Sequence, residues 1–143
     1  MYRRDLILRL IERFGRALIA LRNRILKREA EAAPLQSEIH GIADEAGLDL
    51  DLARRLDPQT LVMWLAPTGE VDEAKFWLLG ELLYLEGLAA QERGEAGGGR
   101  DDMARALAVF SKLPAVWRPA ADLASAGERR QELADRLAPT TES

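Results

Sequence analysis

The sequence contains no cysteine, and this absence removes several kinds of chemistry at once. Without thiols the chain forms no disulfide, binds no zinc through sulfur and carries no thiol nucleophile. The absence also fits a reducing compartment, so we expect a cytoplasmic protein. There is a single histidine, His40, and a metal site built on paired histidines therefore lacks its second ligand.

Long apolar runs are also missing. The richest stretch, residues 76–90, is interrupted by Glu81 and Glu86, whereas a membrane-spanning helix needs about 20 consecutive, mostly apolar residues. Charged residues break up the start of the chain as well, so we expect no signal peptide there. Aromatic residues make up only 6 % of the chain, while Ala, Leu, Arg and Glu abound, which favours helices throughout.

Apolar residues recur at helical spacing along most of the chain. We expect helices from about Arg3 to about Ala32 and over residues 35–46, 72–93, 101–113 and 119–137, with two short helical segments between residues 48 and 65. The glycine-rich segment 94–100 is expected to be a flexible connection. The first helix carries the clearest stripe: Ile7, Ile11, Phe14, Leu18, Leu21 and Ile25, widened by Leu6, Leu10 and Ala17.

No strand pattern accompanies these helices, so the chain is predicted to be all-α. Its 143 residues suffice for one compact domain. We expect five to seven helices in antiparallel pairs within a single helical domain over residues 1–137. Residues 138–143 are expected to form a disordered tail.

Charge is distributed unevenly along the chain. Residues 1–28 carry nine basic against two acidic residues, and residues 29–99 carry fifteen acidic against four basic ones. The basic first helix can therefore bind an anionic partner, or it can attract the acidic middle within one fold. The second interpretation is favoured, because the apolar face beside those arginines needs burial in any case.

Three arginines on one face of the first helix, Arg9, Arg13 and Arg16, keep the first interpretation open. Such a face can lie on an anionic membrane or on nucleic acid. The net charge of −4 and the lack of an aromatic platform argue against nucleic acid. The apolar stripe is better explained as core than as a lipid-binding face.

Other candidate sites are weak on sequence grounds. His40 with Glu38, Asp44 and Glu45 would make a poor metal site, because one histidine has no partner histidine or cysteine. A polar surface is the favoured interpretation. No phosphate-binding glycine motif and no catalytic triad pattern is present. We therefore expect no catalytic, cofactor-binding or metal-binding residues and no cofactor.

Glu81 and Glu86 interrupt an otherwise apolar helix. A buried carboxylate there would have a raised pKa and could take part in acid–base chemistry. Five residues correspond to roughly 140° around a helix, so the two cannot readily face one point. We favour the interpretation that each lies at the edge of the buried stripe. Trp64, between Met63 and Leu65, joins Arg9, Arg13 and Arg16 as a candidate partner surface, because a half-exposed tryptophan anchors partners well.

Residues 83–110 resemble a tetratricopeptide helix pair. Gly87 and Gly94 are seven residues apart, Ala106 and Phe110 are four apart, and Leu83 precedes the first glycine by four. In that family the first glycine lets two helices approach, the second ends the first helix, and the alanine and aromatic fill the gap. The resemblance implies a short array of antiparallel helix pairs.

The chain departs from this family at two positions. Glu86 and Ala90 stand where the family has a leucine and an aromatic residue, and the gap from Gly94 to Ala106 is seven residues longer than usual. The resemblance therefore covers one degenerate repeat, and a free-standing array would need further helix pairs from residues 1–47.

Three longer stretches resemble a small bacterial family of unknown function, and these are MYRRDLILRLIERFGRAL, GLDLDLARRLDPQTLVMWL and GEVDEAKFWLLGELLYLEG. This resemblance implies a shared fold and brings no activity. From all these features we expect a non-catalytic interaction or scaffold module that offers a helix-lined groove to a protein or peptide. Such a module is also suited to forming a homodimer. The alternatives are a protein that binds an anionic membrane or nucleic acid through the first helix, and an enzyme whose site the sequence does not reveal.

Overall fold

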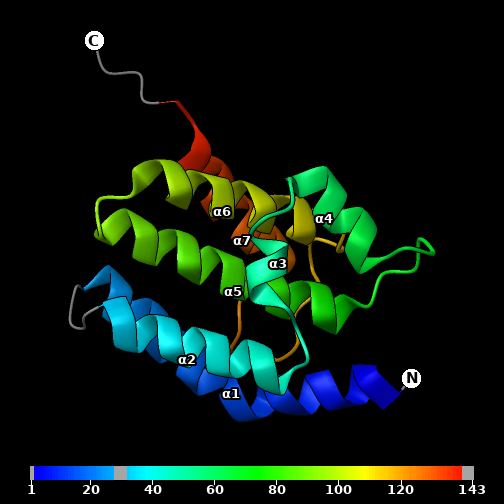
Figure 1. Cartoon of the computed structure of the whole chain (residues 1–143). Helices are drawn as coiled ribbons and strands as arrows, with labels where there is room; N and C mark the ends of the chain where they lie inside the picture. The colour runs from blue at the N-terminus through cyan, green and yellow to red at the C-terminus, as the bar shows by residue number, and fades with distance from the viewer. Residues whose placement is uncertain (1, 28–31, 140–143) are drawn as a thin grey trace.

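The computed structural model describes residues 2–27 and 32–139, which contain helices and no strand (Figure 1). The expected all-α class with five to seven helices is confirmed. The seven helices of these ranges are α1 (Tyr2–Leu26), α2 (Ala32–Glu45), α3 (Leu50–Ala53), α4 (Pro58–Leu65), α5 (Glu73–Glu92), α6 (Ala96–Phe110) and α7 (Ala126–Leu137). The predicted tail lies mostly outside the described residues, which end at Pro139.

Helix α5 is the centre of the fold. It contacts α1, α2, α3 and α6, while α4 and α7 pack on α6. Figure 1 shows α1 and α2 on one side of α5 and α6 on the other. Every residue of α5 from Phe76 to Ala90 is buried. A helix that is apolar on all faces is stable in water only when other helices cover it, so its sequence explains its position.

The ends of several helices follow from their capping residues. The Asp57 side chain accepts from the Thr60 amide at the start of α4, where Pro58 occupies the first helical position. Asp72 caps α5 in the same way. Gly94 follows α5 with a φ of +83°, a conformation that favours glycine. These boundaries agree with the sequence predictions.

The boundary between the first two helices differs from the prediction. α1 ends at Leu26 rather than near Ala32, and α2 already begins at Ala32. Pro34 lies in the first turn of α2, where its missing N–H has no helical partner to lose. Pro34 thus lies just inside the start of α2, and the prediction that the first helix continues almost to this proline is wrong. The predicted helical residues 28–31 lie outside the described residues.

The apolar stripe of α1 is narrower than predicted. Leu6 is 52 % exposed and Ala17 is exposed, while Phe14 is only partly buried. The other positions of the stripe are buried, as expected. α1 packs mainly on α5 and α2, and this leaves one flank of its apolar face open to solvent.

The last two helices also differ from the prediction. α6 begins at Ala96, so residues 96–100 of the glycine-rich segment are helical rather than a flexible connection, and only Gly94 and Glu95 of that segment lie between α5 and α6. A Cβ at Gly99 would lie 2.8 Å from the Gly87 carbonyl oxygen, so glycine is needed where α6 crosses α5. α7 begins at Ala126 rather than near Pro119, because Ser125 and Glu128 form a capping box there.

No helix within the described ranges is long and apolar enough to cross a membrane.

Candidate functional site

Two glutamates lie inside the core of the fold on α5. Glu81 is 2 % exposed and Glu86 is 1 % exposed, so the prediction that both lie at the edge of the buried stripe is wrong. The helices and arginines around α5 cover both side chains almost completely. Because a buried charge is costly without a partner, each carboxylate is met by an arginine from another part of the chain.

The first group, the Glu81 cluster, joins α5 to α1 and α7. Arg129 donates two hydrogen bonds to the Glu81 carboxylate, from Nε at 2.5 Å and from Nη2 at 3.3 Å. Arg22 Nη2 lies 3.6 Å from Glu81 Oε1, and its guanidinium lies 4.3 Å from the centroid of the Tyr84 ring. The Tyr84 hydroxyl donates to Glu132 at 3.0 Å. Paired and stacked arginines of this kind hold three helices in one arrangement.

Burial and neighbouring charges shift two pKa values in this cluster. Burial raises the pKa of the Tyr84 hydroxyl, and the Glu132 carboxylate raises it further. Burial by itself would lower the pKa of Arg129, but Glu81 and Glu132 outweigh it, and the net shift is upward. Because both pKa values are raised, Tyr84 and Arg129 keep their protons at neutral pH. The Glu81 cluster is therefore suited to holding helices together rather than to transferring protons.

The second group, the Glu86 cluster, joins α5 to α2, α6 and the residue after α3. Arg54 Nη1 lies 2.7 Å from Glu86 Oε2. The same guanidinium donates to Asp102, from Nε at 3.2 Å and from Nη2 at 3.1 Å. His40 Nε2 lies 3.8 Å from Glu86 Oε2, and Arg105 donates to Asp102 at 3.3 Å. Since different helices serve the two clusters, the prediction that Glu81 and Glu86 cannot face one point is confirmed.

The Glu86 carboxylate has fewer hydrogen bonds within the described residues than the Glu81 carboxylate. Burial raises the pKa of Glu86, although the positive charge of Arg54 opposes that shift. Neither of its oxygens makes a hydrogen bond with the described part of the chain, so Arg54 attracts it by charge alone. His40 lies between Glu86 and Asp51, with its Nδ1 3.9 Å from Asp51 Oδ1. The described residues include no group of three or more acidic or histidine side chains placed to hold a metal ion.

The residues singled out by the helix-pair resemblance are packing positions between α5 and α6. Leu83, Ala106 and Phe110 are fully buried. A Cβ at Gly87 would lie 2.8 Å from Met103 Cγ and 2.9 Å from the Gly99 carbonyl oxygen. The two helices therefore approach closely at Gly87, which is the geometry that the resemblance implies for this position.

The four residues assigned to a partner surface are all exposed but do not form one patch. Arg9, Arg13 and Arg16 lie on α1. Trp64 is 42 % exposed on α4, beside Met63, which is 66 % exposed. Figure 1 places α1 and α4 well apart in the view, so these positions are two separate surfaces.

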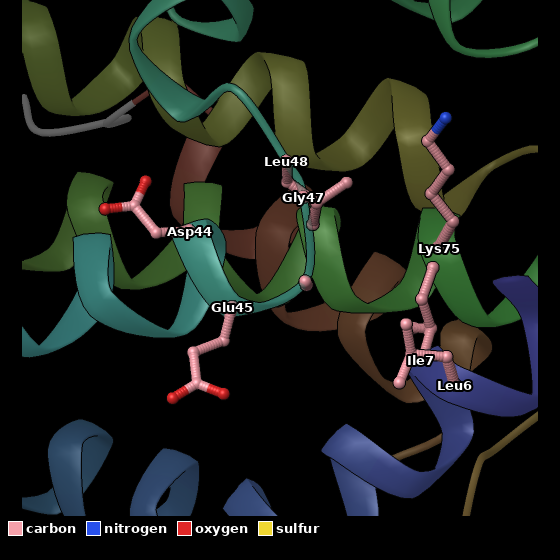
Figure 2. A pocket seen from close by; sticks show the side chains of 8 residues that line it. Leu6, Ile7, Asp44, Glu45, Gly47, Leu48 and Lys75 are labelled. Atoms are coloured by element: carbon pink, nitrogen blue, oxygen red, sulfur yellow. The ribbon is translucent and has the colours of Figure 1, made fainter.

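A hollow with mostly apolar walls lies elsewhere, where the start of α1, the end of α2 and the start of α5 meet. We call it the α1–α2–α5 groove, and its volume is about 270 Å³. Figure 2 shows Asp44 and Glu45 on one side of it, with Lys75 and Ile7 on the other. Its lining residues are Leu6, Ile7, Asp44, Glu45, Ala46, Gly47, Leu48 and Lys75.

The groove combines apolar walls with charged rims. Ile7 and Leu48 are nearly buried, at 4 % and 5 % exposure, and Leu6 stands at the rim with half its surface in solvent. Sequence reasoning missed this groove because it placed Leu6 in the core. The sequence held no signal for it, because the adjacent pair Leu10 and Ile11 has the same pattern as Leu6 and Ile7 and is buried at both positions.

Neither the protein-family models, nor the curated proteins, nor the solved structures with which we compared the chain gave a match. The assignment of a function therefore rests on the α1–α2–α5 groove and the charges around it.

Proposed function

We propose that this protein is a non-catalytic interaction module, which binds a segment of another protein in the α1–α2–α5 groove. The observation that carries the proposal is Leu6, a large apolar side chain that is 52 % exposed at the rim of an apolar hollow. A side chain from a partner that enters this hollow would remove Leu6, Ile7 and Leu48 from water together. Burial of apolar surface is the main favourable term in protein association.

The charged residues around the groove support binding of a protein rather than of a small metabolite. The groove is open to solvent, and the charged residues Asp44, Glu45 and Lys75 line it beside the apolar ones. An apolar centre with a polar rim is the usual composition of a protein interface. Small-molecule sites instead enclose most of their ligand.

Photo-crosslinking in the producing cells tests this proposal. A benzoylphenylalanine introduced at position 6 should give a discrete adduct with another protein. The same residue at position 26 is the control, because Leu26 is 44 % exposed on the same helix. Twenty residues of helix separate the two positions by about 30 Å, so one small partner segment cannot contact both.

A blocking variant makes the crosslink specific to the groove. Ala46→Trp puts a large side chain at the wall of the hollow and should suppress the adduct from position 6. No adduct, an adduct that survives Ala46→Trp, or an adduct with a second copy of this chain would each overturn the proposal.

A second candidate function is binding of an anionic membrane or nucleic acid through α1, and the exposure of Arg9 and Arg16 favours it. Several other cations of α1 are instead engaged within the fold. Arg22 lies 3.6 Å from Glu81, and Arg24 donates to Glu38 at 2.7 Å. Because much of the basic charge meets acidic residues of the same chain, the groove remains the preferred surface.

A further inference from the structure

A second hollow adjoins the α1–α2–α5 groove on the far side of the turn between α2 and α3. Its volume is about 380 Å³, and it shares Asp44, Gly47 and Leu48 with the groove. Its remaining lining residues are His40, Asp49, Leu50 and Asp51. We call it the acidic hollow. An apolar recess and an acidic recess thus lie next to each other across three shared residues.

Negative charge dominates the two recesses. Asp44, Asp49 and Asp51 are exposed, and Asp51 keeps 67 % of its side-chain surface in solvent. Asp44, which borders both recesses, makes no ion pair or side-chain hydrogen bond with the described part of the chain. Lys75 is the only permanent cation among the lining residues of the two recesses.

Two other cations near the recesses, Arg54 and Arg13, are already engaged with carboxylates. Arg54 interacts with Asp51 but is held by Glu86 at 2.7 Å and by Asp102 at 3.1 Å. Arg13 lies 3.6 Å from Glu45, which lines the groove but not the acidic hollow. The Asp49 carboxylate also accepts a hydrogen bond from the Leu52 amide at the start of α3. Among the described residues, the carboxylates of the acidic hollow are therefore in excess of the positive charge around them.

We infer that the α1–α2–α5 groove and the acidic hollow together bind a basic amphipathic segment of a protein, with an apolar side chain in the groove and lysine or arginine beside Asp44. This inference rests on the proposed function and adds the chemistry of the partner. Lys75, on the opposite side of the groove from Asp44 (Figure 2), sets the direction of the segment, because a second cation there would be repelled. Complementary charge of this kind governs specificity and association rate.

Synthetic peptides of equal length test the inference on the full chain. The first has leucines on one helical face and lysines on the other. The second replaces lysine by glutamate, and the third keeps lysine but replaces leucine by serine. Binding is followed at about 0.15 M salt by the amide NMR shifts of the protein. The leucine–lysine peptide should bind at least about tenfold more tightly than either other peptide, with shifts centred on Leu6 and Asp44.

Matched variants separate this site from general attraction to an acidic protein. Asp44→Lys should weaken binding of the leucine–lysine peptide about tenfold, and a lysine at the end of α2 suits the helix dipole, so folding is retained. Asp101→Lys removes an exposed carboxylate on α6 and should leave binding unchanged. Leu6→Asn should weaken binding, while Leu26→Asn should not.

The outcomes also distinguish the inference from the proposed function. Equal binding of the lysine and glutamate peptides, or equal loss in the Asp44 and Asp101 variants, would overturn the inferred partner chemistry. If the crosslink from position 6 still captured a protein in that case, the interaction function would stand and only its basic partner would be wrong. If both experiments failed, both proposals would be wrong.

Discussion

Glu86 and Arg54 face each other at 2.7 Å inside the protein, although 32 positions separate them in the chain. Arg54 directs two of its nitrogens to Asp102, and this fixes the plane of the guanidinium. Glu86 is consequently attracted by the charge of Arg54 but accepts no hydrogen bond from it. The contact joins the segment after α3 to α5. Because the attraction depends on the charge of Glu86, the strength of this contact changes when Glu86 is protonated.

The protonation of Glu86 should make the stability of the protein depend on pH. Burial raises the pKa of Glu86 in the folded protein, so the folded state holds this proton more tightly than the unfolded state. Binding of this proton therefore stabilises the folded state fully below the pKa of an unfolded glutamate, about 4.3. This contribution is lost as the pH rises through the pKa of Glu86 in the folded protein. Glu86→Gln removes this titration. Its Tm relative to wild type should rise by several degrees between pH 4 and pH 7.

The control for that measurement is Glu70→Gln, which removes the charge of an exposed glutamate before α5. Thermal melts followed by circular dichroism at matched ionic strength provide the comparison. A constant difference in Tm between Glu86→Gln and wild type over the whole pH range would contradict the raised pKa of Glu86.

Two arginines that pair with glutamates should differ sharply in their contributions to stability. Arg129→Ala leaves Glu81 buried without its two hydrogen bonds, and breaking a buried pair costs about 3–5 kcal/mol. Arg24→Ala breaks an exposed pair with Glu38, which is worth about 0–1 kcal/mol. Urea unfolding measures both. Similar losses for the two variants would show that burial does not govern the strength of the Glu81 cluster.

The fold class was predictable because its signals are local. Asp57 with Pro58, Asp72 and Gly94 each specify a helix end through neighbouring residues, and the structure places helix ends there. The close approach of α5 and α6 at Gly87 could also be predicted, because it depends on a small residue at a characteristic spacing. Such features need no knowledge of which helices meet.

The buried charges and the groove were not predictable in this way. Whether Glu81 is buried depends on Arg129, which lies 48 residues away and on another helix. Leu6 and Phe14 both match the apolar period of α1, yet the neighbouring helices cover Phe14 only in part and Leu6 even less. Phe14→Ala should therefore cost less than the 3–5 kcal/mol expected for a fully buried phenylalanine. Periodicity identifies one face of a helix, whereas tertiary packing decides how much of it is covered.

Gly87 and Gly41 form a matched pair for testing the crossing of α5 and α6. Gly87→Ala would place a Cβ 2.8 Å from Met103 Cγ and 2.9 Å from the Gly99 carbonyl oxygen, and such overpacking costs about 1–3 kcal/mol. Gly41→Ala meets open space on α2 and should stabilise the protein by about 0.5–1 kcal/mol, since alanine favours helix. Thermal melts should thus move in opposite directions. A stable Gly87→Ala protein would mean that the two helices do not touch at this position.

The exposed arginines of α1 distinguish the groove from the membrane or nucleic-acid alternative. Among the described contacts, replacing Arg9, Arg13 and Arg16 by glutamine breaks the exposed pair between Arg13 and Glu45 and the contact of Arg13 with the Phe14 ring. Such surface contacts are weak, so stability should change by no more than about 1 kcal/mol. If the groove is the functional surface, wild type and triple variant should show equally weak retention on anionic vesicles and on duplex DNA at about 0.15 M salt. Cosedimentation and electrophoretic mobility measure the two ligands separately.

A control triple variant removes the same charge from other helices and loops, at the exposed residues Arg55, Arg100 and Lys112. Binding that depends only on net charge should weaken equally in both triple variants, because each loses three positive charges. Binding through α1 should weaken only when Arg9, Arg13 and Arg16 are replaced. Strong retention of the wild type that survives the control but not the α1 variant would make α1 the functional surface and would move the site away from the groove.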